Sequence, residues 1–139
     1  MRRFMTWRSG AGSGRWRVAA PFVLMAVAAS VLAAARPDLK AYFQSGFADA
    51  AYQQGALNKV LKAWTSPASW PKPGSKTVVQ TAIGRDGKLI NALVSMASGS
   101  AEWDAAALAA VKQASPFAPL PRTYGRPNLQ VHWHFSVVP

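Results

Sequence analysis

The chain has 139 residues, no cysteine and a formal net charge of +11 at pH 7. This length fits one domain, and the lack of cysteine excludes disulfides, thiolate catalysis and cysteine-based metal sites. The charge suggests nucleic-acid binding, but five arginines lie in the first 17 residues and the later cations are scattered among few aromatic side chains. Because no basic run is interleaved with aromatics, we expect no nucleic-acid partner.

Residues 18–35 form an apolar, uncharged segment between Arg17 and Arg36. As a helix this segment would be ~27 Å long, close to the thickness of a bilayer hydrocarbon core, about 30 Å. The arginine-rich residues 1–17 then predict a cytoplasmic head. Two outcomes stay open: a single-pass transmembrane helix retained as a signal anchor in the inner membrane, or a signal peptide cleaved near Ala35, which sends the rest to the periplasm. We favour retention.

The remaining chain divides into a short linker, residues 36–46, and a periplasmic domain, residues 47–139. From Asp38 to Trp64 apolar residues recur at spacings of three and four, which predicts a helix whose first half is a separate short helix or a lead-in. Three prolines soon after Trp64 end it.

Two β-rich runs, Thr77–Ile83 and Lys88–Met96, flank an Asp-Gly pair and predict a hairpin. With Asp86 and Gly87 as a two-residue loop, apolar side chains gather on one face of the hairpin. This face contains Val79, Ile83, Ile90, Ala92, Val94 and Met96.

A second helix is predicted over Ala101–Ala114, with acidic residues in its first turns, where they oppose the helix dipole. Closely spaced prolines after Ala114 stop it. The last strand, Asn128–Val138, alternates apolar and polar residues, so one of its faces is buried.

Helix, hairpin, helix and final strand predict an α+β fold. A right-handed helical crossover brings the third strand parallel to the second. The expected three-stranded sheet has the order 2-1-3, with the final strand at a free edge.

These elements resemble the C-terminal domain shared by TonB and TolA, the energy-transducing proteins of the cell envelope. The matching pieces, in order, are Tyr52-Gln53, Trp64 with Pro67, the turn from Ile83 to Leu89, Ser98-Gly99, Asp104 to Val111, and Ser115 to Pro121.

The resemblance implies a non-catalytic periplasmic domain that binds the extended segment of an envelope protein along its last strand. The expected partner-binding residues are Leu129, Gln130, Val131, His132, Trp133, His134 and Phe135. Expected partners are a TonB-dependent-type transporter or an inner-membrane motor, with homodimers through sheet edges as an alternative. Two departures count against the usual transducer role: Ala34 stands one turn after Ser30, where transducers carry histidine, and no long spacer follows the apolar segment.

Other functions have less support. His132 and His134 have a spacing that suits a metal, but a solvent-facing strand face explains them equally, and we expect neither metal nor cofactor. A triad from Ser98, a histidine and Asp104 lacks any nucleophile motif, so we expect no catalytic residue. A rival interpretation is a cleaved periplasmic accessory protein that binds acidic envelope polymers through its positive charge.

Overall fold

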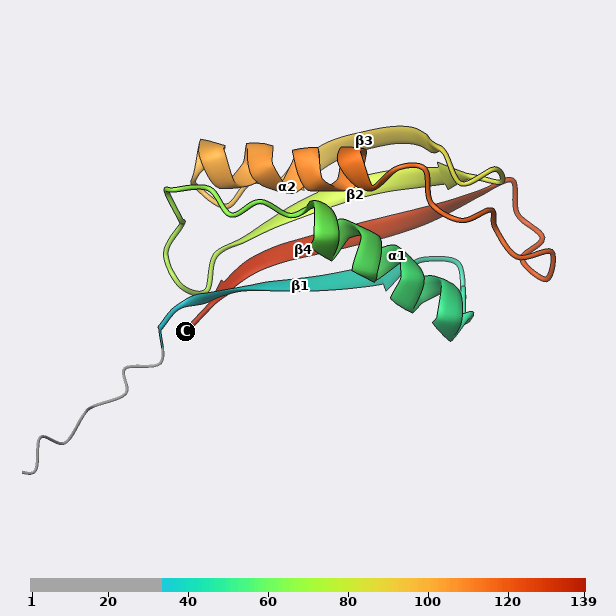
Figure 1. Cartoon of the computed structure of the whole chain (residues 1–139), viewed down its shortest axis with the longest axis horizontal. Coiled ribbons are helices and arrows are strands. Elements are labelled where there is room, and N and C mark those ends of the chain that lie inside the picture. The colour runs from blue at the N-terminus through green and yellow to red at the C-terminus, as the bar shows by residue number, and fades with distance from the viewer. Residues whose placement is uncertain (1–33) are drawn as a thin grey trace, which may run out of the picture. The chain divides into compact units, whose positions relative to one another are not determined.

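The computed structural model describes residues 34–139, which form a four-stranded sheet and two helices (Figure 1). The elements in chain order are β1 (Arg36–Phe43), α1 (Ala50–Ala63), β2 (Lys76–Gly84), β3 (Leu89–Met96), α2 (Ala101–Ala114) and β4 (Asn128–Val138). The strand order is β1-β4-β2-β3, and every neighbouring pair is antiparallel. The α+β class is therefore confirmed.

The predicted three-stranded sheet is wrong because a fourth strand, β1, precedes α1. The three predicted strands do pair in the predicted order, with β2 between β3 and β4, and β3 runs parallel to β4 across it. β1 occupies most of the expected linker, residues 36–46, and the helix begins only at Ala50. Leu39, Ala41 and Phe43 alternate with polar residues, a strand pattern that the helical spacing of nearby aromatic residues obscured.

The predicted hairpin is present, but its turn is longer than the expected two-residue loop, because β2 ends at Gly84 and β3 begins at Leu89. Val79 pairs with Val94 as expected, but bulges at both ends change the register, and Ile83 pairs with Leu89 instead of Ile90. The expected inward positions of Ile90 and Met96 are therefore wrong: their side chains are 61% and 50% exposed.

Both helices begin at capping side chains. Asp49 accepts a hydrogen bond from the Tyr52 amide, and Ser100 accepts one from the Trp103 amide. α2 has the predicted bounds, Ala101–Ala114. Among residues 34–139, no helix is long and apolar enough to cross a membrane. The predicted cytoplasmic head and almost all of the predicted membrane segment lie outside the described residues.

The core lies between the helices and one face of the sheet. Trp103 of α2 and Trp133 of β4 are fully buried in it, together with alternate residues of β2 and β4. Their indole N–H groups donate to Phe135 O and Thr81 Oγ1, at 3.1 and 3.0 Å. The opposite face of the sheet, the outer face, carries the intervening residues of each strand, and no described helix covers it.

Candidate protein-docking edge

β4 is not at an edge, so the sequence-based expectation of a free rim along Leu129–Phe135 is wrong for this structure. β2 pairs with one side of β4, and β1 pairs with the other side. The β1 register begins with Arg36 opposite Val138 and ends with Phe43 opposite Val131. The backbone pairing continues one residue further, because the Gln44 amide donates to Gln130 O at 3.0 Å. The β4 edge could accept a strand only after β1 leaves it.

The two sides of β4 are built differently. On the helix side, Leu129, Val131, Trp133 and Phe135 are buried. On the outer side, Gln130 is exposed, and His132 and His134 are partly exposed. The predicted binding residues thus divide into an apolar row that belongs to the core and a polar row that solvent reaches. The apolar row supports the fold directly and leaves only the β4 backbone and the polar row for a partner.

β1, like β3 at the other edge of the sheet, has no buried residue. All its side chains are exposed or only partly buried, whereas β2 and β4 each bury several completely. Phe43 lies against Trp133 with ring centroids 6.1 Å apart, and Leu39 borders a small cavity of about 40 Å³ with Trp64 and Trp103. Because little apolar area leaves water when β1 docks, the release of β1 should cost less free energy than the release of β2 or β4.

A hollow of about 250 Å³ separates β1 from the first half of α1. Its lining residues are Ala41, Phe43, Ala50, Gln53, Gln54 and Leu57. Ala41 is too small to reach across the hollow from its place between Lys40 and Tyr42. The β1 seat, the surface of β4 and α1 on which β1 lies, therefore has room for a larger apolar side chain at the Ala41 position.

The outer face above β4 is rich in cations. Lys40 of β1 pairs in register with His134, and Lys76 of β2 also acts on His134. Burial lowers the pKa of His134, and the charges of Lys76 and His132 lower it further. Lys40 has one described acidic partner, Asp38, with N and O atoms 3.8 Å apart. An exposed ion pair of this length stabilises little. Asp38 therefore only weakly offsets the positive charge that Lys40 and Lys76 place on this face.

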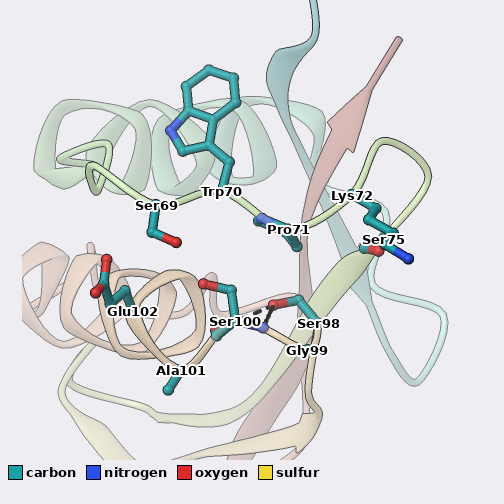
Figure 2. A pocket seen from close by; sticks show the side chains of 10 residues that line it. All are labelled: Ser69, Trp70, Pro71, Lys72, Ser75, Ser98, Gly99, Ser100, Ala101 and Glu102. Carbon is teal, nitrogen blue, oxygen red and sulfur yellow. Dashed lines mark hydrogen bonds between the residues drawn. The ribbon is translucent and has the colours of Figure 1, made fainter.

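A second hollow, of about 470 Å³, lies at the start of α2 beside the loop that carries Trp70 (Figure 2). Ser98, Ser100 and Glu102 line it, but the two serines are already engaged, because the Ser100 amide donates to Ser98 Oγ and Ser100 Oγ caps the helix. These hydroxyl groups are part of the helix cap, and no histidine lines this hollow.

The third member of the hypothetical triad is also structural. Asp104 accepts hydrogen bonds from Thr77 Oγ1 and from the amide and hydroxyl groups of Ser98, the last two at 2.9 and 2.8 Å. Burial raises the pKa of Asp104, but these hydrogen bonds lower it by more. Both histidines lie on the outer face of the sheet, away from α2, so the structure does not assemble the triad.

The two histidines contact other side chains of the sheet. His132 Nε2 lies 3.2 Å from Gln80 Nε2, and the ring of His134 lies against Tyr42. Within residues 34–139, no cluster of three or more histidine, aspartate or glutamate side chains is arranged to hold a metal ion.

Comparison with protein families decides the identity of the fold. The model of the TonB C-terminal family, described as "TonB C terminal", matches residues 49–135, more than half of the chain. The chain belongs to the TonB C-terminal family. No curated protein and no solved structure matches it significantly. The TonB C-terminal match begins at the N-cap of α1, so β1 lies outside the part of the chain that the family shares.

Proposed function

We propose that this TonB C-terminal domain is a non-catalytic docking module in the periplasm, held at the inner membrane by residues 18–35. It binds the extended segment of another envelope protein as an added strand on the β4 side of its sheet. Family membership supports a role in envelope protein interactions. The single observation that carries strand addition is the backbone edge of β4, whose residues 131–138 pair with a strand that lies outside the residues matched by the family model.

The position of β1 limits the type of partner. β1 starts at Arg36, directly after the apolar segment, so no spacer separates the predicted anchor from the sheet. A domain held this close to the membrane favours a partner in the inner membrane or one that extends a long segment toward it. This arrangement does not favour an outer-membrane transporter reached across the periplasm by a long spacer.

A site-specific photo-crosslinker in living cells tests the docking role. Placed at Gln130 or His134, on the outer face of β4, it should give a discrete adduct with one envelope protein. Placed at Lys112, an exposed residue of α2, it should not. Equal adducts from all three positions, or none from any, would contradict the proposal.

The location has a separate test. A tag at the C-terminus should be removed by protease added to spheroplasts but protected in intact cells, and the chain should fractionate with the inner membrane. Recovery of a chain that begins after Ala35 in the soluble periplasmic fraction would instead support cleavage.

A further inference from the structure

We propose that β1 is a placeholder for the partner strand, and that the partner carries an acidic residue at the Lys40 position followed by a bulky aliphatic residue at the Ala41 position. This inference rests on the proposed function. It adds that β1 covers the binding edge of β4 in the free protein and that a partner segment of defined sequence displaces β1. The partner segment displaces β1, pairs antiparallel with β4, and takes over the backbone hydrogen bonds that β1 makes.

The first observation is that β1 fits its seat poorly. It pairs with residues 131–138 of β4, but none of its side chains is fully buried, and a hollow of about 250 Å³ remains under Ala41. A leucine or isoleucine at this position could fill part of the hollow, and each added methylene that leaves water strengthens binding. A better-fitting strand can therefore compete with β1.

The second observation is the charge at the adjacent position. Lys40 lies opposite His134, and the charge of Lys76 acts on the same histidine from the other side, so the chain places Lys40 on a face that already carries a cation. A carboxylate at the same position would be attracted to Lys76 and would favour protonated His134. Shape and charge therefore point to the same two-residue signature, an acid followed by a bulky aliphatic residue.

These mismatches also identify the kind of occupant. A second copy of this chain would bring its own Lys40 and Ala41 and would leave the same hollow and the same clustered cations. The seat is thus better suited to a different protein than to a β1-swapped dimer. Release of β1 would also free residues 36–46, up to the buried Phe47, and these residues could span about 36–40 Å when extended, so docking would lengthen the tether of an anchored domain.

The test uses a disulfide that locks β1 in place in the full chain, purified in detergent. Asp38 and Ser136 are register partners on the outer face, and Asp38→Cys with Ser136→Cys places two thiols at a Cα separation suited to a disulfide. Ala82→Cys with Asn91→Cys provides the matched control, because it joins β2 to β3 and leaves β1 free. The chain has no native cysteine that could interfere.

The probe is a fluorescent peptide with the sequence of residues 36–44 that carries Lys40→Glu and Ala41→Leu. We expect it to bind the reduced Asp38/Ser136 variant and to bind the oxidised form at least ~10-fold more weakly, while oxidation leaves binding to the control variant unchanged. The unsubstituted peptide should bind about 10-fold more weakly than the probe, since it repeats both mismatches. Equal binding to the oxidised and reduced forms would overturn the inference, as would failure of the reduced form to bind.

The same lock separates this inference from the proposed function in cells. If the crosslinked adduct persists with the oxidised Asp38/Ser136 variant, the partner binds without displacing β1 and the inference is wrong while the docking role stands. If neither form gives an adduct, the docking role itself fails. Hydrogen exchange supplies a measurement that needs no partner: amides of β1 should exchange faster than those of β2, and similar protection in both strands would also overturn the inference.

Discussion

The ring of Tyr42 on β1 lies against the ring of His134 on β4, with centroids 4.6 Å apart. This contact joins the strand outside the family domain to the strand expected to bind partners. Two charged groups act on His134, Lys76 from β2 and His132 from β4 itself, while Lys40 of β1 is its register partner and forms an ion pair with Asp38.

The first prediction concerns pH. Because burial and the nearby cations lower the pKa of His134 below 6.5, the unfolded chain takes up a proton more readily than the folded domain. The stability linked to His134 is therefore fully present above pH 6.5 and is lost as the pH falls through the folded pKa.

Thermal unfolding followed between pH 7 and pH 5 should show a falling midpoint, and His134→Gln should flatten that fall. His132→Gln removes one of the charges that lower the pKa of His134, so it should flatten the fall only in part. If His134→Gln leaves the pH dependence of the midpoint unaltered, the lowered pKa of His134 in the folded domain does not contribute to the loss of stability.

A second prediction tests the buried indole bond. Thr81 Oγ1 accepts the indole N–H of Trp133 at 3.0 Å and donates to Val131 O at 3.2 Å. Thr81→Val keeps the shape but leaves the buried N–H without an acceptor, which should lower the free energy of unfolding by about 1–3 kcal/mol. Urea unfolding measures this loss, and Thr123→Val on an exposed loop should change it by less than ~0.5 kcal/mol.

A third prediction separates two effects at glycine. Gly87 and Gly99 both have positive φ, 87° and 95°, but a Cβ at Gly87 would lie only 2.0 Å from Phe117 O, whereas nothing lies within 4 Å at Gly99. Gly99→Ala should cost about 1–2 kcal/mol from backbone strain alone.

Gly87→Ala should cost clearly more, because the Phe117 amide donates to Gly87 O at 2.8 Å and the two segments must then separate. Chemical denaturation of both variants provides the comparison. Equal losses would show that the close approach to Phe117 contributes nothing.

A fourth prediction uses the alternation of backbone donors along β1. Since the Gln44 amide points to Gln130, alternation directs the amide of Lys40 toward β4 and that of Ala41 away from it. Lys40→Pro should therefore loosen β1, while Ala41→Pro removes only a donor on the open side.

With the fluorescent peptide, Lys40→Pro should raise the apparent affinity about 2- to 10-fold, as expected for one lost hydrogen bond. If binding instead takes place on the open edge of β1, Ala41→Pro should weaken it and Lys40→Pro should not strengthen it.

A proline in β4, at Gln130 or His132, would not test partner binding, because β4 has neighbours on both sides. Such a proline removes a donor inside the sheet on one side or the other and weakens the fold itself. Variants on β1 are therefore the informative ones.

The sequence by itself determined the elements whose signals are local. The alternation of Leu129, Val131, Trp133 and Phe135 specified a half-buried strand, and the acidic residues and prolines around α2 indicated both of its ends. The order and spacing of the motif pieces between Tyr52 and Pro121 gave the resemblance to the TonB and TolA domains, and the family model over residues 49–135 confirmed the TonB C-terminal family.

Only the tertiary structure decided what lies beside β4. Leu39, Ala41 and Phe43 alternate over too few residues to outweigh the helical spacing of the aromatic residues that follow, and strand pairing depends on partners distant in the sequence. The two bulges in β3, which turn Ile90 and Met96 outward, likewise arise from pairing with β2. Whether an edge is free or covered depends on the assembled sheet, so no local pattern in β4 could reveal that β1 occupies it.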